Sequence, residues 1–537
     1  MSPVSCLRAQ LFRYTLAMLI GSLAFTGCQK PTTEPVLEAG NPDAPASSAT
    51  AGTGGAPSAT ELLRKVAPSD TWDMLFMQGS RVGYTHTTVT PVKESGRKLL
   101  RIDSESSLTV TRFGQKNKQS IEIGSTETLD GRVVGFRTLT AFGPTPMEIT
   151  GEWNAESGKL QLTSRMGDQQ QTAAISLPPN CRGFFANEQV LQERPLAAGE
   201  TVTFPALVPI LNQVATIHLV SRGQESTRLL DGTSHELLRV DCMTTMPDGN
   251  EIGSTMWVSE QGEVLKSRTE AMQQETYRVT REVAMSEAPS PGFDLGIDAM
   301  VRVEPALTDP HATQRVRYRV QLQGGDPAEV FASCPSQQIQ RLDDNTAELT
   351  VLAIRPDMPA EAPANVVAPL AADRFPNALV QSDDPAVLAL VDKIALGETD
   401  LWRVAVAMER WVHENLTNKN FSQAFSSAAE VAQTREGDCT EHAVLLAALL
   451  RARGIPARVA IGLVYVEPNQ SFGYHMWTEA FVRDRWIPLD ATLAKGGIGG
   501  AHLKLLDTSL DGASAFSSFL PVAQVLGRLK IEVLEAR

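Results

Sequence analysis

The sequence predicts a multidomain protein in which antiparallel β-rich N-terminal domains precede a domain of the α+β class. The chain has 537 residues, which at roughly 150 residues per domain allows three or four units. Short alternating segments with glycine-containing turns fill the first half, and the pattern changes to a helical period near residue 383. With 42% hydrophobic and 20% charged residues, the composition is globular and excludes collagen-like, coiled-coil and wholly disordered proteins.

The first 27 residues have the pattern of a bacterial export signal. Arg8 and Arg13 precede a short apolar run at 16–25, and small residues follow it. That run is shorter than the roughly 20 apolar residues of a comfortable membrane-spanning helix. We therefore expect a signal peptide at 1–27.

Cys28 follows this signal, and residues 25–28 resemble the lipobox of bacterial lipoproteins, in which the cysteine is acylated. Phe25 stands where that motif usually has Leu. Residues 28–60, rich in Pro, Ala, Ser, Thr and Gly, predict a disordered tether. The sequence thus predicts an exported lipoprotein, periplasmic or at the outer membrane or cell surface, anchored through Cys28. Export with cleavage but without lipidation is the alternative.

The charge balance limits the partners of the protein. The chain has 48 Lys and Arg residues against 62 Asp and Glu residues, a formal net charge of −14. We expect no nucleic-acid partner, because binding to phosphates needs a net basic surface. The acidic residues are spread along the chain, which indicates solubility rather than a specific partner.

Residues 61–290 are expected to form one or more β-rich domains. Alternating segments are separated by turns that carry a glycine, a signal of β-hairpins. The segments lie at 81–89, 108–113, 119–127, 132–142, 216–220 and 263–270, and the turn glycines are Gly131, Gly158, Gly232, Gly249 and Gly262. Residues 291–375 are expected to hold a further β-rich domain, with segments at 316–322 and 346–354 and a Pro- and Ala-rich linker.

Residues 376–510 are expected to form the α+β domain, followed by a C-terminal tail at 511–537. Helical periods occur at 400–416 and 439–453, and Asp384 with Pro385 marks another helix start. The segment 439–453 is apolar nearly all round, which predicts a buried helix. Strands are expected at 457–466, 474–482 and 486–489.

Cys439 lies at the predicted start of the buried helix. A thiol there faces backbone N–H groups without helical acceptors and the positive end of the helix dipole, which favours the thiolate. The same N–H groups can stabilise the oxyanion of an acyl intermediate. Asp438 is expected to cap the helix, and Glu441 and His442 are expected to orient its first turn or to lie in the cleft.

His475 and Asp490 complete a candidate catalytic set. They lie on two predicted strands joined by a turn at 483–485, which can bring the two side chains together. His475 would then take the proton of the Cys439 thiol, and Asp490 would hold the imidazole tautomer. Trp477 is expected to line the cleft or the core.

These blocks resemble the transglutaminase-like superfamily, whose fold is that of papain-like cysteine acyl transferases and proteases. The matching segments are 437–439, 453–459, His475 with Trp477, and 486–492, in the family's order of Cys, His and Asp. The resemblance covers roughly residues 383–506. One departure is Ala491, where the family commonly has Pro. The resemblance implies catalysis by Cys439, His475 and Asp490, without a cofactor.

Other interpretations of the cysteines remain open. Cys439, His442 and His475 could hold zinc, but such sites usually present paired ligands and a closed set of four, so no metal is expected. If Cys439 is catalytic, at most one disulfide can form among Cys181, Cys242 and Cys334. The other histidines, His86, His218, His235, His311, His413 and His502, have no neighbours in sequence that suggest a site.

The preferred function is a cysteine enzyme that acts on peptide or side-chain amide bonds of a protein or peptide substrate through a thioester. The resemblance to bacterial members favours hydrolysis over cross-linking. The alternative is a tethered binding or assembly protein whose transglutaminase-like domain is degenerate. The sequence does not identify a partner for the β-rich domains.

Overall fold

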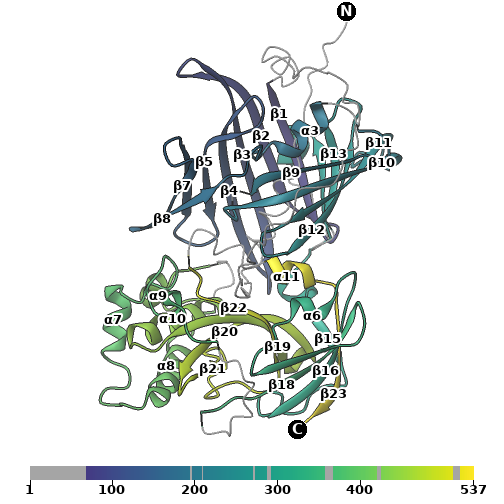
Figure 1. The fold of residues 1–537 in the computed structure, drawn as a ribbon. Helices are drawn as coiled ribbons and strands as arrows, with labels where there is room; N and C mark the ends of the chain where they lie inside the picture. The colour runs from purple at the N-terminus through teal and green to yellow at the C-terminus, as the bar shows by residue number, and fades with distance from the viewer. Residues whose placement is uncertain are drawn as a thin grey trace, which may run out of the picture.

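The computed structural model describes residues 68–193, 196–208, 210–269, 273–286, 292–356, 367–419, 425–511 and 520–537. The predicted signal peptide, Cys28 and the predicted tether lie outside these residues. Figure 1 shows two bodies, each built on a sheet, with the helices α7 to α10 gathered at one side of the second body. Within the described residues, no helix is both long and apolar enough to cross a bilayer.

The first body is an antiparallel sheet, called here the N-terminal sheet. Its 14 described strands follow the order β8-β7-β6-β5-β4-β3-β2-β1-β14-β13-β12-β11-β10-β9, so almost every strand pairs with its neighbour in sequence. The strands are β1 Ser69–Met77, β2 Ser80–Glu94, β3 Arg97–Arg112, β4 Gln115–Thr128, β5 Val133–Ala141, β6 Met147–Asn154, β7 Lys159–Met166, β8 Gln169–Ser176, β9 Thr201–Val208, β10 Gln213–Arg228, β11 Ser234–Thr245, β12 Glu251–Val258, β13 Val264–Thr269 and β14 Gln274–Val279.

Side-chain alternation and turn chemistry explain this sheet. On β3, Leu108 and Val110 are buried whereas Thr109 between them is exposed, because successive side chains of a strand point to opposite faces. The predicted turn glycines take positive φ values, for example +84° at Gly131 and +81° at Gly262. The prediction of antiparallel β structure in this region is confirmed.

The second body contains a mixed sheet assembled from distant segments. Its order is β17-β18-β16-β23-β15-β20-β19-β22, and β21 pairs with β20. All its pairings are antiparallel except that of β15 with β23. The strands are β15 Val301–Glu304, β16 Arg315–Leu322, β17 Gln337–Arg341, β18 Thr346–Leu352, β19 Ala457–Val466, β20 Ser471–Val482, β21 Arg485–Leu489, β22 His502–Thr508 and β23 Leu529–Ala536.

This sheet differs from the division expected from sequence. The segments 291–375 and 511–537 were expected to be a separate domain and a tail, yet both supply strands to the sheet that contains β19 to β22. The strand β23 lies between β16 and β15 and buries Ile531 and Val533. Such pairing over more than 200 residues of sequence leaves no local signal in the chain.

The helices of the second body lie near the predicted positions. Asp384 caps α7 Pro385–Val391, Asp400 caps α8 Leu401–Asn415, and Ser427 caps α9 Ala428–Thr434. The helix α10 Cys439–Ala452 is buried almost throughout, as its apolar sequence predicts. The remaining described helices are α3 Ala186–Glu193, α4 Arg281–Met285, α5 Leu295–Asp298, α6 Pro327–Val330, η2 Ala371–Asp373, η3 Glu467–Asn469 and α11 Leu520–Val525.

The cysteines of the described residues are all free thiols. Cys181 and Cys242 are buried, whereas Cys334 and Cys439 are half-buried. The single disulfide that the sequence allowed among the first three is therefore not formed in this structure.

Candidate active site

The first turn of α10 is shaped by the segment that precedes it. Gly437 has a φ of +148°, and a Cβ atom there would approach the side chain of Glu441 to 2.3 Å, so this position favours glycine. Asp438 Oδ1 accepts a hydrogen bond from the Thr440 N–H at 2.9 Å, and Glu441 Oε2 accepts one from the Asp438 N–H at 2.9 Å. The second of these bonds, together with the bond from the Glu441 N–H to the Asp438 side chain, forms a capping box that fixes the direction of the helix start.

Cys439 is the first residue of α10 and is half-buried. Its backbone therefore lies where helical N–H groups have no acceptor within the helix. Cys439 therefore lies at a helix N-terminus, as predicted, and remains partly exposed to solvent.

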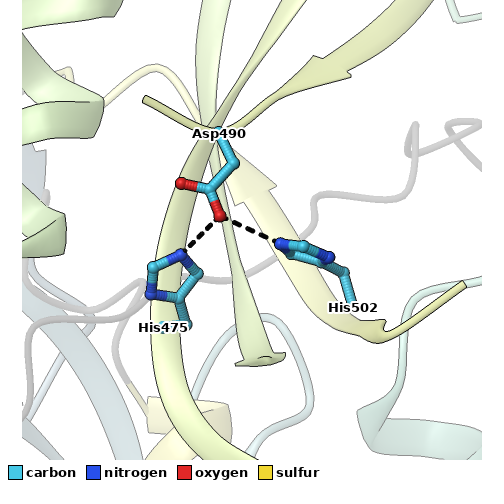
Figure 2. Close-up of side chains that lie close together, drawn as sticks. All are labelled: His475, Asp490 and His502. Carbon is cyan, nitrogen blue, oxygen red and sulfur yellow. Dashed lines mark hydrogen bonds and ion pairs between the residues drawn. The ribbon is translucent and has the colours of Figure 1, made fainter. Parts of the chain in front are cut away.

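His475 and Asp490 are brought together by the hairpin of β20 and β21. The two strands pair antiparallel from Thr478 opposite Leu489 to Val482 opposite Arg485. His475 Nε2 lies 2.8 Å from Asp490 Oδ2, and Figure 2 shows the imidazole pointing at that oxygen. The hairpin therefore brings these two side chains together, as the sequence predicts.

Cys439 also interacts with His475. Burial alone would lower the pKa of His475, but the charge of Asp490, the charge of Cys439 and hydrogen bonds to both raise it to about 10. In turn, burial alone would raise the pKa of Asp490, but His475 and its hydrogen bonds hold it well below the usual range. The imidazole is thus set to carry a proton at neutral pH beside the Asp490 carboxylate.

The helix and the strand are tied to one another close to these groups. Thr478 Oγ1, on β20 three residues after His475, donates to the Ala443 carbonyl of α10 at 3.0 Å. Both residues are buried. This bond fixes the distance between the element that carries the thiol and the element that carries the imidazole.

A second histidine contacts the same carboxylate, which the sequence analysis did not foresee. His502 Nε2, on β22, lies 3.0 Å from Asp490 Oδ2, opposite His475 (Figure 2). Burial lowers the pKa of His502 to about 4, so the ring is neutral and donates through Nε2. The sequence around His502 suggested no site, because β22 reaches Asp490 only through the pairing of the sheet.

The structure brings three potential metal-ligating side chains together at this point. Among the described residues, the group whose ligand atoms all lie within 4.8 Å of one another is His475, Asp490 and His502. It differs from the set weighed from sequence, because Cys439 and His442 are not in it. The two imidazole N–H groups already donate to Asp490 Oδ2, and this pattern fits a hydrogen-bonded carboxylate rather than a cation site.

Glu409 on α8 holds the segment that carries Asp490. Its Oε1 accepts from the Asp490 N–H at 2.9 Å and its Oε2 from the Gly496 N–H at 3.0 Å. Burial, opposed by these bonds, raises the pKa of Glu409 to about 7. Sequence reasoning missed this residue, because an acidic residue within an amphipathic helix is ordinarily exposed.

The remaining predicted residues surround the site without contacting Asp490. His442 Nδ1 donates to the Asp438 carbonyl oxygen at 2.6 Å and is buried. Trp477 is 1% exposed, and its ring packs against those of His475 and His502, so it belongs to the core rather than to an open cleft. Glu441 is fully buried in the first turn.

Comparison with known families agrees with this architecture. Residues 388–491 match the family model described as the transglutaminase-like superfamily, so this part of the chain is a transglutaminase-like domain. No curated protein matches the chain.

Several solved structures are similar to parts of the chain. A proposed cysteine protease from Cytophaga hutchinsonii is 18% identical, covers 41% of this chain and 81% of its own, with a TM-score of 0.26. A β-barrel-like protein of unknown function from Brucella abortus is 11% identical, and the match covers 40% of this chain and 96% of the other, with a TM-score of 0.30. The periplasmic domain of TgpA from Pseudomonas aeruginosa, bound to ethylmercury, is 16% identical. The match covers 35% of this chain and 77% of the other, with a TM-score of 0.22.

Proposed function

We propose that the protein is a cysteine enzyme that cleaves peptide or side-chain amide bonds through a thioester on Cys439. The observation that carries this proposal is the placement of a half-buried thiol at the start of α10 beside His475, which Asp490 holds at 2.8 Å. The transglutaminase-like domain supplies the chemical class.

In the proposed reaction the Cys439 sulfur attacks the carbonyl carbon of the substrate, and the carbonyl electron pair moves to oxygen. When the oxyanion collapses, the C–N bond breaks and the amine or ammonia leaves with the proton of the His475 imidazolium. Water then gives a proton to His475 and attacks the thioester, the C–S bond breaks, and the acid and the thiolate are released. An amine in place of water would make the product a new amide.

The nucleophile can be tested without knowing the substrate. In the full chain, we expect iodoacetamide to alkylate Cys439 at pH values well below about 8.5, the ordinary value for a free thiol. The pKa of Cys181 and that of Cys242 are each raised by burial to about 12, so their peptides serve as unreactive internal controls in mass spectrometry.

Variants decide whether the reactivity comes from the site. His475→Ala should slow the alkylation of Cys439 near neutral pH by on the order of 100-fold, because the ion pair that favours the thiolate is lost. His235→Ala, which removes an exposed imidazole from the N-terminal sheet, is the matched control and should react like the wild type. Slow alkylation of Cys439 in the wild type, or equal rates in His475→Ala and His235→Ala, would favour the alternative of a tethered binding protein without catalytic activity.

The preference for hydrolysis needs a separate assay. Denatured casein is incubated with the enzyme and a fluorescent primary amine, and new N-termini, released ammonia and amine incorporation are followed in parallel. We expect hydrolysis products to exceed incorporated amine, and Cys439→Ser to abolish both. Amine incorporation as the main product would identify a cross-linking enzyme.

We further propose that the protein is exported and lipid-anchored through Cys28. The support is the sequence of residues 1–60 alone. Cells fed an alkynyl fatty acid should label the wild-type protein in the membrane fraction, and Cys28→Ala should lose the label. Equal labelling of the two proteins, or none in either, would contradict the anchor.

A further inference from the structure

The start of α10 receives a charged side chain from the other body of the molecule. Arg112 is the last residue of β3 in the N-terminal sheet, and its Nη2 lies 2.7 Å from Asp438 Oδ2. The side chain of Arg112 is 19% exposed and that of Asp438 is 1% exposed. This ion pair joins residues 326 positions apart, one of which immediately precedes Cys439.

Two carboxyl groups lie in the first turn of α10, and their pKa values shift in opposite directions. Burial alone would raise the pKa of Asp438, but Arg112 lowers it, so this carboxylate stays charged. Burial and then the charge of Asp438 raise the pKa of Glu441 well above its usual range. The Arg112 guanidinium, 2.7 Å from Asp438 Oδ2, offsets the negative charge of Asp438 beside the thiol.

We infer that Arg112 is a positioning residue of the active site, which offsets the Asp438 carboxylate so that the Cys439 thiolate can form. The N-terminal sheet is then part of the catalytic machinery rather than a separate binding module. The inference rests on the proposed function, because it concerns the same thiol. It follows from Coulomb interaction, since an unpaired buried carboxylate next to a nucleophile disfavours a second negative charge.

The N-terminal sheet presents Arg112 from an anchored hairpin. Next to Arg112, the backbone N–H groups of Phe113 and Gly114 donate to the two carboxylate oxygens of Asp294 at 2.8 and 2.7 Å. These bonds fix the turn between β3 and β4. The guanidinium therefore reaches α10 from a held position and not from a loose surface loop.

A second contact between the two bodies lies in the loop after β5. A Cβ atom on Gly143 would lie 1.8 Å from the carbonyl oxygen of Phe425, so the two backbones are in close contact. Thr145 Oγ1 donates to Glu430 Oε1 at 2.5 Å. This contact does not involve the start of α10. Breaking it therefore tests the effect of weakening the contact between the two bodies without changing the charge beside the thiol.

The groups that set the charge at Cys439 come from several elements. Arg112 lies on β3, Asp438 and Glu441 lie at the start of α10, and His475 lies on β20 with Asp490 behind it. Removing Arg112 leaves the Asp438 carboxylate unbalanced, and removing the carboxylate leaves the guanidinium unbalanced. The two changes should therefore move the titration of the thiol in opposite directions.

The test measures the rate of iodoacetamide alkylation at Cys439 in the full chain between pH 5 and pH 10. Arg112→Gln should slow the reaction near neutral pH about tenfold and move the rising part of the profile about one unit toward alkaline pH. Asp438→Asn, which keeps a good helix cap, should move it toward acid pH. The double variant should lie close to the wild type, and Thr145→Val should not move the profile.

Each outcome decides the inference. A wild-type Cys439 without enhanced reactivity would sink the proposed function itself, whereas a reactive wild type with an unchanged profile in Arg112→Gln would overturn only the role of Arg112. If alkylation of Cys439 slows equally in Arg112→Gln and in the double variant, Arg112 acts by holding the two bodies together and not by offsetting the charge of Asp438. If Arg112→Gln does not fold, an alkaline shift in Asp438→Asn overturns the inference and an acid shift supports it.

Discussion

The two bodies of the molecule bring their strands together in different ways. In the N-terminal sheet nearly every strand pairs with its neighbour in sequence, whereas the second sheet places β23, from the end of the chain, between β16 and β15. The residues of the candidate site belong to the second body, and β20, β21 and β22 deliver His475, Asp490 and His502 to one point. Local pairing builds the N-terminal sheet, whereas the candidate site combines the local hairpin of β20 and β21 with the helices α8 and α10, which contact it from further away in the chain.

Buried polar groups occur in both bodies. The N-terminal sheet buries hydroxyl pairs such as Thr85 with Ser106, 2.8 Å apart, and the ion pair of Arg278 with the fully buried Asp73 at 2.7 Å. In the second body Lys504, fully buried, is bonded to Glu479 at 2.7 Å and to Asp507 at 2.6 Å. Changes of charge and pH should therefore affect the stability of both bodies, whereas their effect on the reactive thiol should be largest in the second body, which holds the candidate site.

The largest effect is expected when the hydrogen-bonded set of the second body is broken. Asp490→Asn keeps the shape but replaces an acceptor with a group that can donate, so the imidazole tautomer and its charge are no longer supported. The rate of Cys439 acylation by an activated ester should fall by on the order of 10²–10⁴-fold, while the melting of the N-terminal sheet is unchanged. A loss below threefold would contradict the role of this carboxylate.

A smaller effect is expected when the contact between the two bodies is broken. Gly143→Ala places a methyl group 1.8 Å from the Phe425 carbonyl oxygen, which should cost about 3 kcal/mol or separate the backbones there. Thermal unfolding and proteolysis near residue 425 measure it. Gly253→Ala on β12, whose Cβ would meet only the tip of Met243 at 3.7 Å, is the control and should unfold like the wild type.

The pH dependence of stability should reveal Glu409. Its pKa in the folded protein is about 7, above the ordinary value of about 4.5, so its stabilising contribution is complete below pH 4.5 and is lost as the pH rises through 7. The stability of Glu409→Gln relative to the wild type should thus increase by about 3 kcal/mol between pH 4.5 and pH 8. Chemical denaturation at several pH values measures this difference, and a constant difference would refute it.

His502 should have a moderate effect on the reactive thiol. His502→Phe keeps a ring of similar size but removes one of the two imidazole donors of Asp490, so the carboxylate holds His475 less firmly. We expect alkylation of Cys439 to slow by about tenfold, roughly 1.4 kcal/mol, and His502→Gln to recover part of it. Identical profiles for all three proteins would limit His502 to packing.

The smallest effect is expected on the surface of the N-terminal sheet. Arg101 and Asp103 form an ion pair at 3.1 Å with both side chains about half exposed. Arg101→Gln should change the free energy of unfolding by less than about 0.5 kcal/mol, because water screens the pair. A loss above 1 kcal/mol would show that charge matters in this body too.

Much of the fold was predictable, because its signals are local. Alternation and turn glycines indicated the hairpins of the N-terminal sheet, and the caps Asp384 and Asp400 indicated the starts of α7 and α8. The apolar run after Asp438 indicated the buried helix α10. These features depend on neighbours within a few residues, so the sequence shows them directly.

The candidate site was predictable only in part. Cys439, His475 and Asp490 stand in recognisable blocks, and the hairpin of β20 and β21 explains why two of them meet. Glu409 was missed because it reaches Asp490 from 81 residues away in the chain. His502 is only 12 residues from Asp490 and was missed because the pairing of β22 with β19, not a hairpin, brings it there. Neither residue lies in a sequence motif that would mark it as part of a site.

The sequence by itself determined the helices, the hairpins, the resemblance to the transglutaminase-like superfamily and the order of the three reactive residues. Only the tertiary structure decided that the end of the chain completes the second sheet and that Arg112 meets Asp438 beside the thiol. The physical reason is that helix caps, side-chain alternation and turns act over a few residues. Pairing of distant strands and compensation of buried charges depend on distances in space, which the chain acquires only when it folds.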